Sequence, residues 1–593
     1  MSNLITTKSM DYSLSKIIKE DAKVSMAKAF RKMLPLLAEE KGKLVVSFIS
    51  VLLNAGLTLL GPLVVGYTID TYVSKGDYRG VLVYSAILLG IYVLAFISNY
   101  IQMRVMGGVA QRTLWKLRND VFVKLQELPL AFFNQNKSGD LISRINNDTE
   151  KLNQFFSQGL MRFAGNIFIV IGAGIFILFI NFKLALASLI PGIGIFVFVQ
   201  LVSKWVGKRN AASLAASGQL SGEIQESMTN FKVILAFNRR DYFRTKFAEA
   251  NERNFKEAFG AGIANELFTP VFEFAGNLAQ LAVIAVGIGL VASGQFALGL
   301  LVSFVLYVTR FYDPLREMAR LWAMLQTAMA AWDRIGRVLH LESNLKVIPH
   351  GKTDGRGLIQ FKDVSFGYPD GSEVFRNVNF VFEKGKTYAL VGPTGGGKTT
   401  TASLIARLYD PTSGTVYLEG KDIRSFEPQE RAKHIGFILQ DPFLFTGTVK
   451  DNLAYGNEEL AGYSTDDLTK LLKSSGLDSL LQRFDKGLET KVSSGSSLSL
   501  GQKQIIAFMR AVLRKPKLLI LDEATANIDT VTEAILEDIL KKLPKETTRV
   551  VIAHRLNTIE NADDIFFVNG GEVKEAGSME HAVEMLLHHK RKS

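Results

Sequence analysis

The stretch Gly392-Pro-Thr-Gly-Gly-Gly-Lys-Thr399 decides how this chain is interpreted. It fits the pattern G-x-x-x-x-G-K-[ST], in which glycines let successive backbone N–H groups surround phosphate oxygens. A short apolar run at 387–391 precedes the pattern and a helix-like run at 400–407 follows it. The N-terminus of such a helix adds positive potential at the same place. We therefore predict a phosphate-binding loop, and the alternative is a glycine-rich turn that matches by chance.

We predict that a nucleotide contacts every residue of this loop and also Thr400, the residue that follows it. Lys398 is placed to reach the outer phosphates, and the Thr399 hydroxyl is placed to hold Mg²⁺. The full set of predicted loop contacts is Gly392, Pro393, Thr394, Gly395, Gly396, Gly397, Lys398, Thr399 and Thr400.

The composition predicts a membrane part followed by a soluble part. The chain has 593 residues, 48% of them hydrophobic and 21% charged, and the apolar runs are concentrated before about residue 357. We predict an N-terminal tail with an amphipathic helix (1–40), a membrane domain (41–340) and a nucleotide-binding domain (357–593). The net charge of +12 is explained by basic residues beside membrane spans, and no basic patch predicts nucleic-acid binding. Cysteine is absent, which excludes thiol catalysis and thiolate metal sites.

Six apolar stretches are long enough to cross a bilayer, which takes about 20 residues. They lie near 44–69, 81–103, 156–180, 184–204, 268–292 and 297–318. The two long connections, 104–155 and 205–267, are rich in Lys and Arg, so the positive-inside bias places them in the cytoplasm. Their helical periodicity predicts that the spans extend beyond the membrane. The predicted fold is a membrane α-helical bundle, six transmembrane helices with long cytoplasmic extensions, fused to an α/β P-loop ATPase domain.

Polar residues inside the spans form a second group of candidates. Glu273, Asn277 and Gln280 are spaced to share one face of the fifth span, as Arg162 and Asn166 are in the third, and Arg310 lies in the sixth. Such residues are costly in a membrane and face protein or water. They predict either hydrogen bonds between helices or the lining of a substrate cavity.

The soluble part contains further candidates at the ends of apolar strands. Asp522 and Glu523 end the strand that begins at Leu518; Asp522 is placed to bind Mg²⁺ and Glu523 to polarise an attacking water. Gln440 and His554 each follow another short strand, where side chains face the nucleotide in such sheets. Tyr368 is a candidate for stacking on adenine, and the alternative is an ordinary core aromatic.

The segment Leu498-Ser-Leu-Gly-Gln502 completes the pattern. Ser499, Leu500, Gly501 and Gln502 lie at the start of a predicted helix, where a second anion site can form. Taken in order with Tyr368, the phosphate loop, Gln440, Asp522-Glu523, 526–529 and His554, this segment resembles the nucleotide-binding domain of an ABC transporter. Together with six spans, the chain resembles an ABC exporter half-transporter of the multidrug-resistance type.

That resemblance implies ATP and Mg²⁺ as ligands and a second half-transporter as partner. In such pairs each ATP lies between one chain's phosphate loop and the other chain's signature motif, so Ser499 to Gln502 would act in trans. The resemblance makes Glu523 the catalytic base and His554 a sensor of the γ-phosphate, and it makes Gln440 a link from Mg²⁺ to the membrane part. It also places Asp529 in the D-loop. The breaks near 134–140 and 227–241 would be coupling helices.

Two departures from the family pattern bear on the partner. Leu500 stands where the family has Gly or a polar residue, and 492–497 lacks the acidic and arginine residues common there in homodimers. We therefore favour a heterodimer over a homodimer.

These features predict ATP-driven export of a small amphiphilic or apolar substrate such as a drug, lipid or peptide. The mechanism would be dimerisation of the nucleotide-binding domains with alternating access, in a multi-pass protein of the cytoplasmic membrane whose ATPase part lies in the cytoplasm. An ATP-gated channel or regulator on the same scaffold is the alternative.

Overall fold

The computed structural model describes residues 12–14, 33–349, 351–493, 498–522, 530–552 and 562–590. The chain divides into two compact units. The helical unit comprises residues 21–126 and 139–340, and the sheet unit comprises 1–20, 127–138 and 341–593. Glu523, Asp529, His554, 494–497 and most of the predicted N-terminal amphipathic helix lie outside the described residues.

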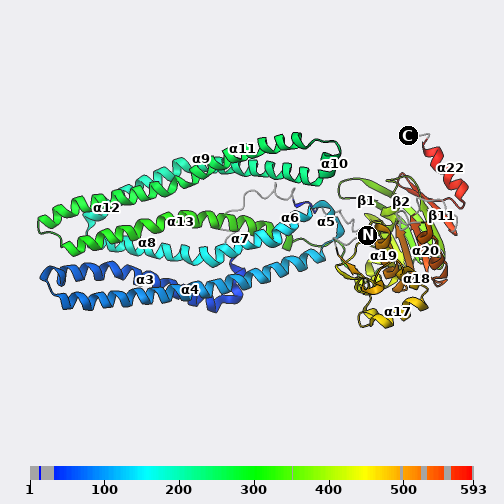
Figure 1. The fold of residues 1–593 in the computed structure, drawn as a ribbon, viewed down its shortest axis with the longest axis horizontal. Helices are drawn as coiled ribbons and strands as arrows, with labels where there is room; N and C mark the ends of the chain where they lie inside the picture. The colour runs from blue at the N-terminus through cyan, green and yellow to red at the C-terminus, as the bar shows by residue number, and fades with distance from the viewer. Residues whose placement is uncertain are drawn as a thin grey trace, which may run out of the picture. The chain divides into compact units, whose positions relative to one another are not determined.

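Long antiparallel helices build the helical unit (Figure 1). They are α3 (Lys41–Thr71), α4 (Tyr78–Glu127), α8 (Leu160–Ile180), α9 (Phe182–Thr229), α11 (Arg240–Glu266), α12 (Phe268–Ala292) and α13 (Leu298–Leu339). Shorter elements complete the unit: the 3₁₀ helix Leu34–Glu40, α6 (Ser138–Ser143), α7 (Thr149–Gln154), α10 (Phe231–Ala236), and π-helical turns at Arg144–Asp148 and Phe155–Gly159.

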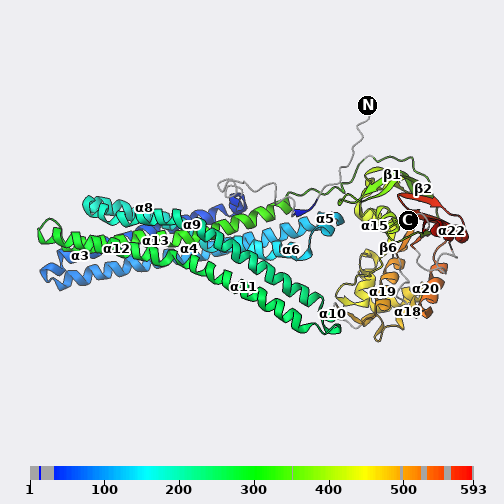
Figure 2. The ribbon, with the colours of Figure 1, turned by 90° about the horizontal axis from the view of Figure 1, so that it is seen from above.

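Six of the described helices are long and apolar enough to cross a membrane, which confirms the predicted spans. The two long connections are largely helical, as their periodicity predicted: α4 extends to Glu127, and α9 and α11 run side by side in both views (Figures 1 and 2). The spans therefore continue as helices well past the roughly 20 residues that a bilayer requires.

The core of the helical unit lies where α3, α8, α9, α12 and α13 meet. Gly66 and Gly299 allow a close crossing of α3 and α13, because a Cβ added to Gly299 would lie 2.2 Å from the Gly66 carbonyl oxygen. Asp70 caps α13, since its carboxylate accepts hydrogen bonds from the backbone N–H groups of Gly299 at 2.6 Å and Leu300 at 3.1 Å. Backbone contact and capping thus fix the start of α13, the helix that carries most of the charged residues discussed below.

The sheet unit contains two main sheets. The strands are β1 (Ile359–Gly367), β2 (Glu373–Phe382), β3 (Thr387–Val391), β4 (Ser413–Leu418), β5 (Lys421–Asp422), β6 (Ile435–Ile438), β7 (Gly447–Thr448), β8 (Lys491–Val492), β9 (Leu518–Asp522), β10 (Thr548–Ile552), β11 (Asp564–Asn569) and β12 (Glu572–Glu575). One sheet has the order β2-β1-β4-β5 with antiparallel neighbours. The other has the order β12-β11-β3-β10-β9-β6, and only β12 pairs antiparallel.

Helices accompany these sheets. They are α5 (Leu130–Gln135), α14 (Lys398–Ile405), α15 (Pro428–His434), α16 (Val449–Ala454), α17 (Thr465–Ser474), α18 (Asp478–Leu481), α19 (Leu500–Leu513), α20 (Thr530–Lys542) and α22 (Met579–Lys590). A common apolar core joins α16 to α20 with β6 and β9, through residues such as Leu453, Leu468 and Ile506. The parallel strands β3, β10, β9 and β6 end at one edge of their sheet, where ligands bind in α/β folds.

Candidate functional site

The phosphate loop connects β3 to α14, as the sequence predicted. Gly392, Gly395 and Gly397 have positive φ angles of 147°, 81° and 111°, which side chains disfavour. A Cβ at Gly392 or Gly396 would lie 2.1 or 2.5 Å from the Val568 carbonyl oxygen of β11. A Cβ at Gly395 would have no atom within 4 Å. The loop is therefore packed against the sheet on one side and open at Gly395 on the other.

Lys398 is almost fully buried at the first position of α14. Its ammonium donates hydrogen bonds to the carbonyl oxygens of Gly392 at 2.8 Å and Pro393 at 3.1 Å. The loop thus holds one cation beside the N–H groups at the start of a helix. This donor set fits the phosphates of a nucleotide, because a cation and backbone N–H groups converge on one place.

Tyr368 follows β1 and lies beside the phosphate loop. Its hydroxyl is 3.0 Å from the Thr400 hydroxyl, and its ring meets that of Tyr409 edge-on, with centroids 5.3 Å apart. No sequence motif singled out Tyr409, because an aromatic residue between a helix and a turn is usually core. In the structure it is the direct neighbour of the predicted adenine platform.

Tyr409 also contacts the first elbow of the helical hairpins. The Asn134 side chain of α5 donates a hydrogen bond of 2.8 Å to the Tyr409 hydroxyl. Burial raises the pKa of Tyr409, and the hydrogen bond from Asn134 lowers it in part, so the hydroxyl remains neutral at physiological pH. One tyrosine therefore connects α5 to Tyr368.

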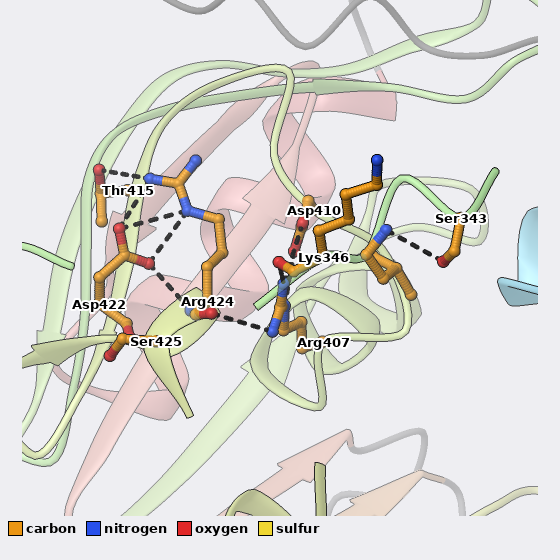
Figure 3. Close-up of polar contacts among 9 residues, drawn as sticks. Ser343, Lys346, Arg407, Asp410, Thr415, Asp422, Arg424 and Ser425 are labelled. Atoms are coloured by element: carbon orange, nitrogen blue, oxygen red, sulfur yellow. Dashed lines mark hydrogen bonds and ion pairs between the residues drawn. The ribbon is translucent and has the colours of Figure 1, made fainter. Parts of the chain in front are cut away.

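The segment after α14 also holds the chain that leads from α13 into the sheet unit (Figure 3). Arg407 is buried and has a φ of 50°, an unusual value for a residue with a side chain. Its guanidinium pairs with Asp410 at 2.9 Å and donates to the carbonyl oxygens of Lys346 at 2.7 Å and Arg424 at 3.3 Å. Arg424 is in turn paired with Asp422 at 2.7 Å. The stretch 407–410 thus contacts α5 through Tyr409 and the connection from α13 through Arg407, which donates to Lys346.

A short N-terminal segment adds to this grip. The Tyr12 hydroxyl donates to the Glu342 carbonyl at 3.0 Å and accepts from the Asn344 N–H at 2.9 Å. The Asn136 side chain donates to the Tyr12 carbonyl at 3.0 Å and accepts from the Leu14 N–H at 3.1 Å. Residues 12–14 therefore bridge the end of α5 and the connection from α13, which no sequence motif indicated.

Asp522 and Gln440 lie at the same edge of the parallel sheet. Asp522 is the last residue of β9, and Gln440 follows β6, whose Ile438 is paired in register with Leu521. β9 is joined to the phosphate-loop strand β3 through β10. The carboxylate and amide oxygens at these positions, with the exposed Thr399 hydroxyl, are the hard ligands that Mg²⁺ prefers.

The signature segment begins α19, as predicted. Ser499 is the N-cap, and it forms a capping box in which its hydroxyl accepts from the Gln502 N–H at 3.1 Å and its N–H donates to the Gln502 side chain at 2.9 Å. The Gln502 amide also donates to the Arg483 carbonyl at 2.7 Å. Leu500 is 40% exposed, so its side chain is at the surface beside the helix N-terminus rather than in the core.

In the helical unit, three helices line an open polar cavity of 480 Å³, in which Arg310 and Arg320 are exposed. Its lining comes from α8, α12 and α13 and includes Asn166, Arg310, Asp313, Arg316, Glu317 and Arg320. The lining does not include the predicted stripe Glu273, Asn277 and Gln280. Glu273 instead pairs with Arg316, Gln280 donates to the Thr309 hydroxyl at 3.0 Å, and Asn277 is exposed. Two of the three predicted residues thus join α12 to α13 beside the cavity.

Comparison with known proteins agrees with both parts of this description. The family described as "ABC transporter transmembrane region" matches residues 44–315, and the family described as "ABC transporter" matches residues 375–526. An uncharacterized ABC transporter ATP-binding protein of Bacillus subtilis is 34% identical, over 93% of this chain and 92% of its own length.

Two further relatives have names that state a cargo. A fatty acid ABC transporter ATP-binding/permease protein of Mycobacterium bovis is 33% identical, over 85% of this chain and 79% of its own length. An ATP-dependent lipid A-core flippase of Pasteurella multocida is 30% identical, over 94% of this chain and 96% of its own length. Since the two family matches follow one another on a single chain and the relatives align over most of their length, the chain belongs to the ABC transporter family, as an ATP-driven exporter half-transporter that binds ATP, spans the membrane and acts in a dimer.

Proposed function

We propose that this half-transporter exports a small amphiphilic or apolar cargo, and that the residues assembled above power and transmit that movement. The observation that carries the proposal is the phosphate loop, where Lys398 is held at the start of α14 by the loop's own carbonyl groups. The cargo class is supported by relatives named for a fatty acid and for lipid A-core. Neither name indicates the channel alternative.

The residue roles divide between phosphate contact, metal contact and water activation. Lys398 and the N–H groups of 392–400 would bind the phosphates, and Tyr368 would stack on adenine. Mg²⁺ would be held by Thr399, Gln440 and Asp522, and it would neutralise charge on the outer phosphates. From the sequence, Glu523 is proposed as the general base and His554 as the γ-phosphate sensor, with Asp529 in the D-loop.

We test this assignment with Glu523→Gln in the purified full-length transporter. The variant should bind ATP as the parent does and lose at least ~100-fold in turnover, because a general base is removed. Glu459→Gln, which changes an exposed carboxylate of the same unit, is the matched control and should hydrolyse ATP normally. Unchanged turnover in Glu523→Gln would remove Glu523 from this role.

Coupling to the membrane part is proposed to run through α5. Asn134 contacts Tyr409, and the ring of Tyr409 contacts that of Tyr368, the proposed adenine platform. A movement of Tyr368 would therefore be transmitted to α5, the elbow between α4 and α6. Arg407 connects the end of the phosphate-loop helix to the chain that enters from α13. Arg407 and Tyr409, which make these two contacts, are only two positions apart in the sequence. This closeness supports a single point of transmission.

The second elbow, α10, is proposed to dock on the partner half-transporter. Phe231, Val233 and Phe237 are half or more exposed there. An exposed apolar surface of this kind usually marks a protein–protein contact. In the dimer of the family, the partner half-transporter would cover it.

The partner is proposed to be a different chain. In a two-fold dimer of identical chains both sites would contain Leu500, because symmetry copies every feature. Leu500 is exposed at the start of α19, where its side chain would displace the N–H donors relative to a phosphate and so slow the chemistry. Purification from the native cell should therefore recover a second half-transporter, and this chain alone should hydrolyse ATP slowly. Robust hydrolysis by this chain alone would make it a homodimer.

The division of the chain into domains at 1–40, 41–340 and 357–593 stays a prediction.

A further inference from the structure

The cavity of the helical unit contains a charge that its neighbours do not balance. Three arginines and two carboxylates line it, and the contacts Arg162 and Glu273 add one charge of each sign. The cavity therefore has one positive charge in excess. Its volume of 480 Å³ lies within the range of about 300–1,000 Å³ that is usual for small-molecule sites.

The balanced charges form two groups in the middle of α13, near the cytoplasmic end of the predicted sixth span. Glu317 is 3.6 Å from Arg162 and 3.5 Å from Arg320, and it accepts a hydrogen bond of 3.3 Å from Asn166. Arg316 pairs with Glu273 and is 3.8 Å from Asp313. These pairs join α8, α12 and α13, so they have a structural task.

Arg310 is different from these arginines. Among the residues that the structure describes, it makes no ion pair or hydrogen bond, although it lines the same cavity. It is also deeper, because twelve residues separate it from Leu298 at the start of α13, about 18 Å at 1.5 Å per residue. That depth lies inside a hydrocarbon layer about 30 Å thick, where an arginine is costly and marks a function.

Helix geometry keeps Arg310 from reaching the cytoplasmic surface. Side chains on a helix lean toward its N-terminus, and the N-terminus of α13 is at the outer side of the membrane by the predicted topology. Arg310 therefore leans further into the membrane rather than toward the polar groups at Arg316 and Arg320. An unbalanced guanidinium in this position fits a ligand that brings its own negative charge.

We propose that Arg310 receives the anionic headgroup of an amphiphilic cargo, whose apolar tail follows the membrane-facing surface of the spans. The headgroup class is a carboxylate or a phosphate monoester, both of which a guanidinium binds with paired hydrogen bonds. This inference rests on the proposed export function and adds the charge of the cargo to it.

The experiment measures equilibrium binding to the full-length transporter, with any co-purifying partner, in phosphatidylcholine nanodiscs. The probes are dodecanoate, dodecyl phosphate, dodecyltrimethylammonium and inorganic phosphate, with empty nanodiscs subtracted. We expect the two anionic amphiphiles to bind at least ~10-fold more tightly than the cationic one. Inorganic phosphate should not compete, which distinguishes an amphiphile from a free anion.

Three variants distinguish direct contact between Arg310 and the headgroup from the effect of the cavity's net positive charge. Arg310→Gln should raise the Kd of both anionic probes at least ~10-fold, in line with the loss of a charged hydrogen bond. Arg310→Lys should recover most of the binding. Arg320→Gln changes the net charge equally in the same cavity but removes a paired arginine, and it should change the Kd less than ~3-fold.

Several results would overturn the inference. They are equal losses in Arg310→Gln and Arg320→Gln, an unchanged Kd in Arg310→Gln, or tighter binding of the cationic probe by the parent protein. The last comparison needs no variant, so a folding defect cannot hide the answer. ATP turnover of the parent is measured in parallel: its presence with no anion preference defeats this inference alone, whereas its absence defeats the proposed function.

Discussion

The phosphate loop and the membrane cavity both gather charge, but they hold it in opposite ways. In the loop, the Lys398 ammonium donates to two backbone carbonyl groups, and three glycines with positive φ angles shape the backbone around it. In the cavity, side chains of three helices hold one another, and Arg310 has no such partner among the described residues. A rigid backbone suits a loop that is proposed to bind the same phosphates in every cycle, whereas a proposed cargo site built from side chains is easily altered.

The largest effect on ATP turnover is expected from a substitution of Lys398 in the phosphate loop. Lys398→Ala should lower ATP turnover at least ~100-fold, because a charge-assisted phosphate contact cannot be replaced by backbone alone. Lys473→Ala, an exposed lysine of the same unit, is the control. Steady-state hydrolysis of both variants, in protein of verified dimeric state, gives the answer. A change of less than threefold in Lys398→Ala would mean that the loop's N–H groups suffice.

The second test concerns the contact between Asn134 of α5 and Tyr409, both of which belong to the sheet unit. Tyr409→Phe keeps the ring against Tyr368 but loses the hydroxyl that accepts from Asn134. A buried hydrogen bond is worth about 1 kcal/mol, so cargo stimulation of ATP turnover should fall ~5-fold. Asn134→Ala should have the same effect, and the double variant should add little to either single change. Additive losses would show that the two residues act separately.

A smaller effect is expected at the adenine platform. Tyr368→Ala should raise the Kd of ATP ~5-fold, the equivalent of a stacking contribution of about 1 kcal/mol. Tyr368→Phe is the matched variant, because it keeps the ring and loses only the contact with Thr400. Its Kd should stay within twofold of the parent. If Tyr368→Ala binds ATP as the parent does, the ring has a packing role only.

The difference between the regions also explains what the sequence could predict. Phosphate geometry demands glycines and a lysine at fixed spacing, so the loop and β3 were predicted with their observed bounds, whereas α14 begins and ends two residues before the predicted helical run at 400–407. Hydrophobic length predicted all six spans for a similar reason, since bilayer thickness is constant.

Contacts between distant segments could not be predicted in this way. Asn134 and Tyr409 are 275 residues apart, and Tyr12 and Asn344 are 332 apart. The stripe Glu273, Asn277 and Gln280 illustrates the same limit, because spacing of three and four places residues on one face of a helix but does not say what the face meets. In the structure that face meets α13 through Glu273 and Gln280.

The smallest expected effect tests whether the balanced charges of the cavity are structural. Glu317→Gln removes the counter-charge of Arg162 and Arg320 while keeping an oxygen that accepts from Asn166. Polar contacts between membrane helices average about 0.6 kcal/mol, so unfolding stability should fall by no more than ~1 kcal/mol.

Binding should move in the other direction from Arg310→Gln. Glu317→Gln leaves the cavity with a second unbalanced positive charge, so dodecanoate should bind up to ~3-fold more tightly, and dodecyltrimethylammonium more weakly. Glu252→Gln on α11, which pairs with Lys256 outside the cavity, is the control. Weaker binding of dodecanoate in Glu317→Gln would mean that Glu317 positions the site itself. The distinction between paired arginines that hold helices together and one arginine that receives cargo would then have to be abandoned.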